Sequence, residues 1–126
     1  VQIMGMPGVP VEGVRLQNIR LTSNGGGTKA EAAVTPKEMG NGYPEPRRLG
    51  TMPAYGLFAR HVRDLEIANI SMNFEREDLR PAMACVDVDG LEIDNAKAQL
   101  ADGVSAAKFE DVKNLDIRDS PMLETK

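Results

Sequence analysis

Several residue types are scarce in this sequence of 126 residues, and each scarcity narrows the possible classes of protein. The single cysteine, Cys85, excludes a framework of internal disulfides. Aromatic residues are limited to two Tyr and three Phe, fewer than a base-stacking surface needs. No apolar run reaches membrane-spanning length and no signal peptide is visible, so we expect no membrane partner.

Positive charge is also sparse. The formal net charge is -4 and the pI is about 5.0, and no basic cluster exceeds Arg47-Arg48. We therefore expect no nucleic-acid partner. Charged residues make up 27% and apolar residues 41%, ordinary values for a soluble globular chain, and the length predicts a single domain over residues 1–126.

An eleven-residue pattern recurs through the chain. It places apolar residues at steps 0, 3, 5, 8 and 10, and Asn at step 7, and its copies begin at Val11, Val62, Val88 and Val112; the last copy fits until Asp119 replaces the Asn. The last two intervals are 26 and 24 residues, and the first is about twice as long. A period in the twenties with apolar residues two apart, as in Leu65-Glu-Ile67, predicts stacked strands rather than helices.

The pattern predicts an all-β fold, a short right-handed parallel β-helix (solenoid) of about four coils. Leucine-rich repeats have a similar period but need leucines at several fixed steps, which this chain lacks. In a β-helix, equivalent residues of neighbouring coils stack about 4.8 Å apart. The expected rows are an inward Val row, an inward Leu row, an inward Ile row, an Asn row at a turn and an outward acidic row: Val62, Val88 and Val112; Leu65, Leu91 and Leu115; Ile67, Ile93 and Ile117; Asn18, Asn69 and Asn95; Glu66, Glu92 and Asp116.

Residues 23–57 interrupt the repeat and are expected to form a long loop or insertion. Three glycines at 25–27 predict a break, residues 30–34 could form a short helical turn, and later Gly and Pro residues exclude regular structure. Such a long loop is either functional or disordered, and it could also pack on a neighbouring chain.

The segments Pro10-Val-Glu-Gly-Val-Arg-Leu-Gln-Asn-Ile-Arg-Leu-Thr-Ser-Asn-Gly-Gly-Gly-Thr28, Tyr43-Pro-Glu-Pro46 and Gly50-Thr-Met-Pro-Ala-Tyr-Gly56 resemble the C-terminal coils of glycoside hydrolase family 28. That resemblance covers roughly residues 5 to 122 and implies a pectin-degrading polygalacturonase or rhamnogalacturonidase parent, a bacterial secreted or periplasmic enzyme. The family's signatures Asn-Thr-Asp, Asp-Asp, Gly-His-Gly and Arg-Ile-Lys are absent from this sequence. No catalytic residue can therefore be carried over, and the localisation of this chain stays open.

A fragment of a solenoid has open ends with unpaired strand edges and an exposed cross-section of its core. We therefore expect a homo-oligomer. The first hypothesis for function is a non-catalytic, self-associating β-helix module, with carbohydrate as a possible ligand.

The alternative is a small metal-dependent hydrolase of phosphoesters or other esters, with a site around His61 assembled in a homo-oligomer. His61, Asp87 and Asp111 align in one row and could hold a divalent ion such as zinc. A surface His beside solvated carboxylates is the plainer interpretation.

Three further features have both a functional and a structural interpretation. Arg60 and Arg80 could bind an anionic substrate such as a phosphoester or a uronate, or they could pair with acids of the chain. Cys85 aligns with Ala59 and Phe109 and is expected to be a small core residue rather than a nucleophile. The acidic row could resemble a glycosidase's carboxylates or form a solvated face.

Overall fold

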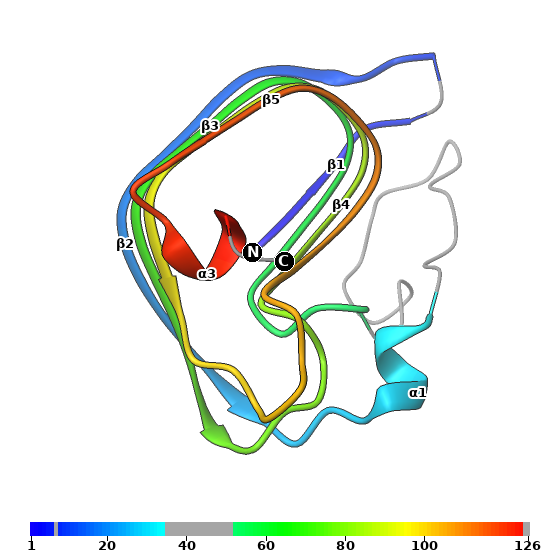
Figure 1. Ribbon diagram of the computed structural model, residues 1–126. Helices are drawn as coiled ribbons and strands as arrows, with labels where there is room; N and C mark the ends of the chain where they lie inside the picture. The colour runs from blue at the N-terminus through cyan, green and yellow to red at the C-terminus, as the bar shows by residue number, and fades with distance from the viewer. Residues whose placement is uncertain (7, 35–51, 125–126) are drawn as a thin grey trace.

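The computed structural model describes residues 1–6, 8–34 and 52–124, and in these residues the fold is mostly β, built on a parallel sheet (Figure 1). In chain order the elements are β1 (Gln2–Met4), β2 (Val11–Gly25), α1 (Lys29–Ala32), β3 (Leu57–Arg76), β4 (Met83–Ala98), β5 (Ala107–Arg118) and α3 (Pro121–Glu124).

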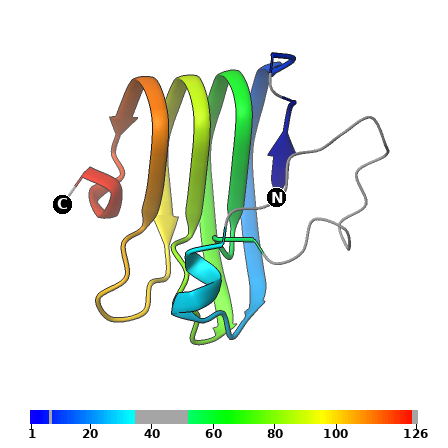
Figure 2. The same cartoon turned by 90° about the vertical axis from the view of Figure 1, so that its right-hand side faces the viewer.

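The long strands lie side by side and follow the same bent path. Strand β3 pairs with β4, and β4 pairs with β5, all in parallel. On the other side of β3, the short strand β1 pairs with its first part and the long strand β2 pairs with the rest. Strands β1 and β2 together therefore follow the same path as β3, and we call each such path one pass of the chain. Figure 1 shows the four passes nearly superimposed, and Figure 2 shows them as a row of ribbons with α3 beyond β5.

The bends in each strand occur at single residues with positive φ. In β3 these residues are His61, Asp64 and Asn69, with φ of 55°, 58° and 55°. None of the three has a partner in the strand register, whereas the residues on either side do. Equivalent bends in the other passes use Asn, Asp or Gly, the residue types that best tolerate the left-handed conformation.

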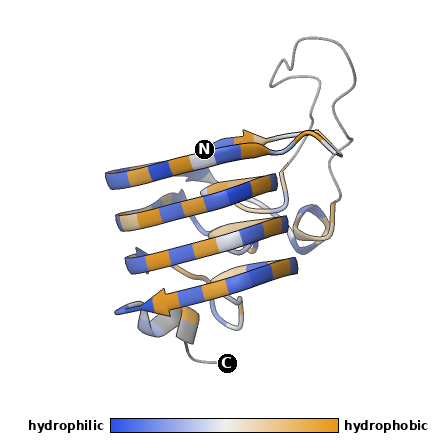
Figure 3. Cartoon of the chain, turned by 90° about the horizontal axis from the view of Figure 1, so that it is seen from above, coloured by the Kyte–Doolittle hydropathy of each residue, from blue (hydrophilic) through white to orange (hydrophobic). Residues whose placement is uncertain are grey.

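The predicted rows form in the expected register. Val62, Val88 and Val112 are consecutive partners, and the Leu and Ile rows follow the same register. Within the straight segments that lie between the bends, polar and apolar residues alternate along each strand, as Figure 3 shows. The apolar residues can therefore face the enclosed core while the polar residues face outward. The main core cluster includes Leu65, Ile67 and Ile70 on β3 with their counterparts on β4.

Asparagine side chains connect the passes at one bend. Asn69 donates a hydrogen bond to Asn18 at 3.1 Å, and Asn95 donates one to Asn69 at 2.8 Å. This confirms the predicted Asn row at a turn.

A second, smaller apolar cluster lies on Phe58 and Ala84, whose neighbours in sequence face the main core. Met52 and Ala54, which precede β3, pack on these two residues, together with Met4 and Val86. The residues leading into β3 therefore cover part of the sheet's second face.

The two outer passes are less well covered than the two inner ones. Leu65 and Leu91 are fully buried, whereas Leu115, the next residue in their row, is 42% exposed. The apolar residues of β2, such as Val14 and Leu16, are half-buried. Only β3 and β4 have a described strand on both sides.

Part of the predicted insertion is regular. Strand β2 continues to Gly25, two residues past Ser23, because Gly25 pairs with Arg76. Helix α1 then begins after Thr28, which forms a capping box with Glu31 and so confirms the helical turn expected there. Residues 35–51 of the predicted 23–57 insertion lie outside the described residues.

Candidate functional site

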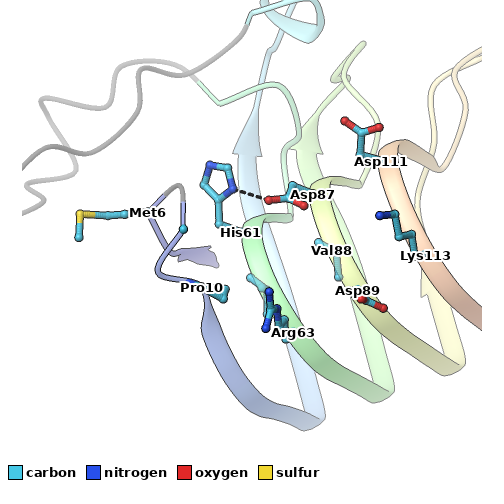
Figure 4. Close-up of a pocket in the computed structure, with 11 residues that line it drawn as sticks. Met6, Pro10, His61, Arg63, Asp87, Val88, Asp89, Asp111 and Lys113 are labelled. Carbon is cyan, nitrogen blue, oxygen red and sulfur yellow. Dashed lines mark hydrogen bonds and ion pairs between the residues drawn. The ribbon is translucent and has the colours of Figure 1, made fainter.

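A shallow pocket of about 150 Å³ lies beside His61 at one bend of the stack (Figure 4). Residues from all four passes line it: Met6, Gly8, Pro10, His61, Val62, Arg63, Asp87, Val88, Asp89, Asp111 and Lys113. It brings together His61, Asp87 and Asp111, the three residues predicted from their shared row.

The wall of this pocket is a loop of the first pass. Where the later passes turn at one residue, the first pass uses a longer segment that includes residues 5–6 and 8–10, with a bridge between Met6 and Val9. Gly5 N donates to the carbonyl of Arg60 at 2.8 Å. Gly5 has no room for a side chain, since a Cβ atom there would overlap the carbonyl oxygen of His61. This close approach holds the loop against His61.

One polar contact joins the predicted row. Nδ1 of His61 lies 2.7 Å from Oδ2 of Asp87, and the side chain of His61 is 11% exposed whereas that of Asp87 is 64% exposed. An ionised carboxylate can only accept, so this bond requires the proton on Nδ1. The bond orients the imidazole, as a carboxylate does for a metal-binding or proton-transferring histidine.

The same residues have a structural role. His61, Asp87 and Asp111 all adopt positive φ, between 52° and 55°, because each one makes the bend of its pass. His and Asp are among the residue types enriched in this conformation. Within the described part of the chain, no group of three or more His, Cys, Asp or Glu side chains is arranged to hold a metal ion.

Charges of both signs surround the pocket. Arg63, Asp89 and Lys113 are consecutive partners on β3, β4 and β5. Asn114 donates a hydrogen bond to Asp89 at 2.7 Å. The pocket is therefore polar and is lined by charged side chains of both signs.

Arg60, predicted to bind an anionic substrate, is buried and 2% exposed. Its guanidinium carbon lies 5.5 Å from the ring centroid of Phe58, a cation–π contact, and Nη2 lies 3.9 Å from Sδ of Met4. A substrate in solvent would not reach the guanidinium in this arrangement.

Arg80, the second arginine predicted for substrate binding, forms an ion pair with Asp78. Burial alone would raise the pKa of the Asp78 carboxyl, but hydrogen bonds from the side chain and backbone of Arg80 hold this pKa below its ordinary value. The side-chain hydrogen bond to Asp78 likewise raises the pKa of Arg80. The pair is structural, and Asp78 was not singled out from the sequence.

Cys85 has the environment of a core residue. It is fully buried, pairs with Ala59 and Phe109 in register as expected, and burial raises its pKa to about 12. A thiol in this state is a poor nucleophile, because the reactive form is the thiolate.

The acidic row lies on the solvent side. Glu66, Glu92 and Asp116 are consecutive partners, and Arg15 of the first pass donates to Glu66 at 2.9 Å. These side chains are substantially exposed, which fits a solvated face better than a pair of catalytic carboxylates.

Comparisons of the chain with protein families, with curated proteins and with solved structures find no match. Among the described residues, no helix is long and apolar enough to cross a membrane.

Proposed function

We propose that the chain is a right-handed parallel β-helix fragment related to the C-terminal coils of glycoside hydrolase family 28, and that it acts as a non-catalytic, self-associating module. The parallel register supports this, because equivalent residues pair in order in the three contacts between successive passes. The bends at single left-handed residues also support it, since they let one continuous strand change direction around a core.

The observation that carries self-association is the incomplete cover of the outer passes. The row of Leu65, Leu91 and Leu115 goes from full burial to 42% exposure at its last member. Each outer strand also has one side without a described partner strand. Another chain covering such an edge would bury apolar surface and satisfy backbone groups.

The absence of the family's four catalytic signatures from the sequence supports a module without glycosidase activity. A retained affinity for oligogalacturonides would fit descent from the family. A titration calorimetry experiment with such oligomers, beside a neutral oligosaccharide of equal length, tests this part of the proposal.

The main test is molar mass by multi-angle light scattering from low to high micromolar concentration. We expect a mass above that of one chain that rises with concentration. A mass equal to one chain throughout would overturn self-association.

A metal-dependent hydrolase is the second candidate function. The hydrogen bond between His61 and Asp87, in a pocket that Asp111 also lines, favours it. The pocket would have room for an ester beside these residues. The imidazole of His61 and a carboxylate would bind the metal. Oligomerisation would then have to supply further ligands.

The test for this candidate uses a chromogenic panel of phosphomonoester, phosphodiester, phosphotriester, carboxyl ester and glycoside, with and without chelator. The variant His61→Asn removes the imidazole but keeps a residue that tolerates positive φ, and Asp102→Ala, in the exposed turn after β4, is its control. Turnover abolished by chelator and by His61→Asn, but not by Asp102→Ala, would support the hydrolase. Turnover absent from the wild type would exclude it for this panel.

A further inference from the structure

The two outer strands of the stack carry complementary side chains, and we infer that copies of this chain join head to tail, with β5 of one copy pairing in parallel with β2 of the next. This inference rests on the self-association proposed above and specifies its partner surfaces. Below, the β5 edge means the side of β5 away from β4, and the β2 edge means the side of β2 away from β3.

The apolar rows match across this contact. Extending the register by one pass places Val112 beside Val11, Leu115 beside Val14, and Ile117 beside Leu16 of the next copy. These are the same kinds of pairs that β3 and β4 make with each other inside one chain. Because a slip of one residue would reverse which side chains face the core, the apolar rows also define the register.

A first charged row alternates in sign and continues across the contact. Within one chain its members are Glu12, Arg63, Asp89 and Lys113, in the order of the passes. The next member would be Glu12 of the following copy, so Lys113 would face a carboxylate. Opposite charges at directly paired positions stabilise a sheet.

A second charged row has its two ends of opposite sign. It runs from Arg15 through Glu66 and Glu92 to Asp116, so that the last three passes place like charges beside each other. Arg15 of the following copy would face Asp116, and it would relieve that repulsion as Arg15 does for Glu66 within the chain. Two independent rows therefore agree on the same partner and register.

This contact joins two different surfaces and is heterologous. Because each pass adds a displacement along the stack, the contact does not close on itself, and the assembly grows by addition of chains. A two-fold contact between two β5 edges would instead stop at two chains and would leave Asp116 without an arginine from another chain.

Helix α3 competes with this contact. It lies beyond β5 and inside the outline of the passes (Figures 1 and 2), and Leu123 packs against the main core cluster. The first pass of an added copy needs part of this space. The free-energy cost of displacing α3 therefore opposes association. Removal of residues 121–126 should eliminate this cost and lower the protein concentration at which the molar mass rises.

Two charge reversals on opposite edges test the inference. Asp116→Lys would face Arg15 of the next copy unfavourably, so association should weaken. Within the chain it would gain a contact with Glu92 and lose the exposed ion pair with Arg118, so the stability of the fold should change little. Arg15→Glu would face Asp116 of the preceding copy unfavourably. At low salt, where exposed charges are least screened, each variant should associate about tenfold more weakly than the wild type.

Controls carry the same change of charge away from both edges. Asp102→Lys lies in the turn between β4 and β5, and Lys97→Glu lies on β4, and both residues are exposed. Thermal unfolding of every variant shows whether its fold is retained. The association of the controls should equal that of the wild type.

The decisive measurement is light scattering on a mixture of the two edge variants. Every contact between Asp116→Lys and Arg15→Glu chains is again complementary in charge, so the mixture should recover wild-type association although neither variant associates well alone. Unchanged association of Arg15→Glu, a mass that stops at two chains, or a mixture without recovery would each overturn head-to-tail joining while leaving self-association standing. A wild type that stays at one chain mass would overturn both.

Discussion

Arg80 donates two hydrogen bonds to the carboxylate of Asp78, from Nε to Oδ1 at 2.9 Å and from Nη2 to Oδ2 at 2.7 Å. Asp78 is fully buried and the side chain of Arg80 is 14% exposed. Arg80 Nη1 also donates to the carbonyl of Met52 at 3.2 Å, and the backbone of Gly27 packs so closely on the pair that a Cβ atom would overlap it. The pair therefore connects the residues that precede β3, the turn that follows β3 and the residues that follow β2.

Removing the carboxylate of this pair should be strongly destabilising. In Asp78→Ala the half-buried guanidinium of Arg80 loses its counter-charge and the buried hydrogen bonds of the carboxylate are lost, and we expect a loss of about 3 kcal/mol in the free energy of unfolding. Glu110→Gln is the control, because Glu110 forms an exposed ion pair with Lys108 at 3.6 Å and its loss should cost less than about 1 kcal/mol. Urea denaturation measures both. Equal costs for the two variants would contradict the structural role of Asp78.

Acid should weaken the protein through the same carboxyl. Because hydrogen bonds from Arg80 lower the pKa of Asp78 in the folded chain below the ordinary 3.8, the folded state binds this proton less readily than the unfolded state. The resulting stabilisation is complete above the unfolded pKa and is lost as the pH falls through the folded pKa. Denaturation at a series of pH values from neutral to strongly acidic should show a shallower acid limb for Asp78→Asn than for the wild type. Parallel acid limbs would contradict this assignment.

The Asn row allows hydrogen bonding to be separated from backbone strain. Asn69 sits in the middle of that row with φ of 55°. Asn69→Gly loses the side-chain hydrogen bonds but accepts this φ, and should cost about 1–2 kcal/mol. Asn69→Ala loses the same bonds and also strains the backbone, and should be less stable than Asn69→Gly by about 1 kcal/mol. An Ala variant as stable as the Gly variant would show that this bend relaxes.

Truncations within the Leu row measure how well each pass is covered. Leu91→Ala creates a cavity between two passes and should cost about 2–5 kcal/mol. Leu115→Ala removes a side chain that is 42% exposed, so its cost at low protein concentration should be less than half as large. At high concentration the cost of Leu115→Ala should grow if another chain covers β5. Unfolding followed at two concentrations tests both statements.

Cys85 should be unreactive until the chain unfolds. With a pKa of about 12, only about one thiol in ten thousand is ionised at pH 8. A disulfide reagent should therefore modify the native protein far more slowly than the urea-unfolded protein. Equal rates would show that the core around Cys85 opens readily.

The repeat predicted the part of the fold that depends on stacking. Asn18, Asn69 and Asn95 form the expected row, and the Val, Leu and Ile rows pair in the expected order. The prediction of these rows was correct because equivalent residues of neighbouring passes have the same surroundings. Each pass therefore needs the same kinds of residue at the same steps, and the pattern can be recognised from its repetition. The short helix after Thr28 was predictable for a local reason, its capping residues.

The parts that could not be predicted involve residues without a repeat. The loop that includes residues 5–6 and 8–10 has no counterpart in the other described passes, so aligning the repeats could not predict that it lies beside His61. Arg60 is buried beside Phe58 and Met4, on the face of the sheet that Met52 and Ala54 help to cover, and these two residues lie between the first two copies of the repeat. Met4 and Val86, the apolar partners of Arg60 in neighbouring passes, are the one signal that pointed to burial.

The pocket residues were ambiguous for a chemical reason. His and Asp bind metals, and both also tolerate the left-handed conformation that a bend requires. A row of His61, Asp87 and Asp111 is therefore compatible with either role when only the sequence is known. Their φ values establish the structural role, and the hydrolase hypothesis remains to be tested by metal-dependent turnover.

The register also has a consequence for how chains of this type can change in length. The interval from Val62 to Val88 is 26 residues and that from Val88 to Val112 is 24, yet both pairs occupy equivalent places. Turns between passes can thus lose or gain residues without disturbing the pairing on either side. A tandem duplication of residues 83–106 would insert one complete pass between existing neighbours, whose own contacts it would reproduce. Genetic growth or shrinkage by whole units is therefore a small structural event in this architecture, whereas a shift of a single residue within a strand is a large one.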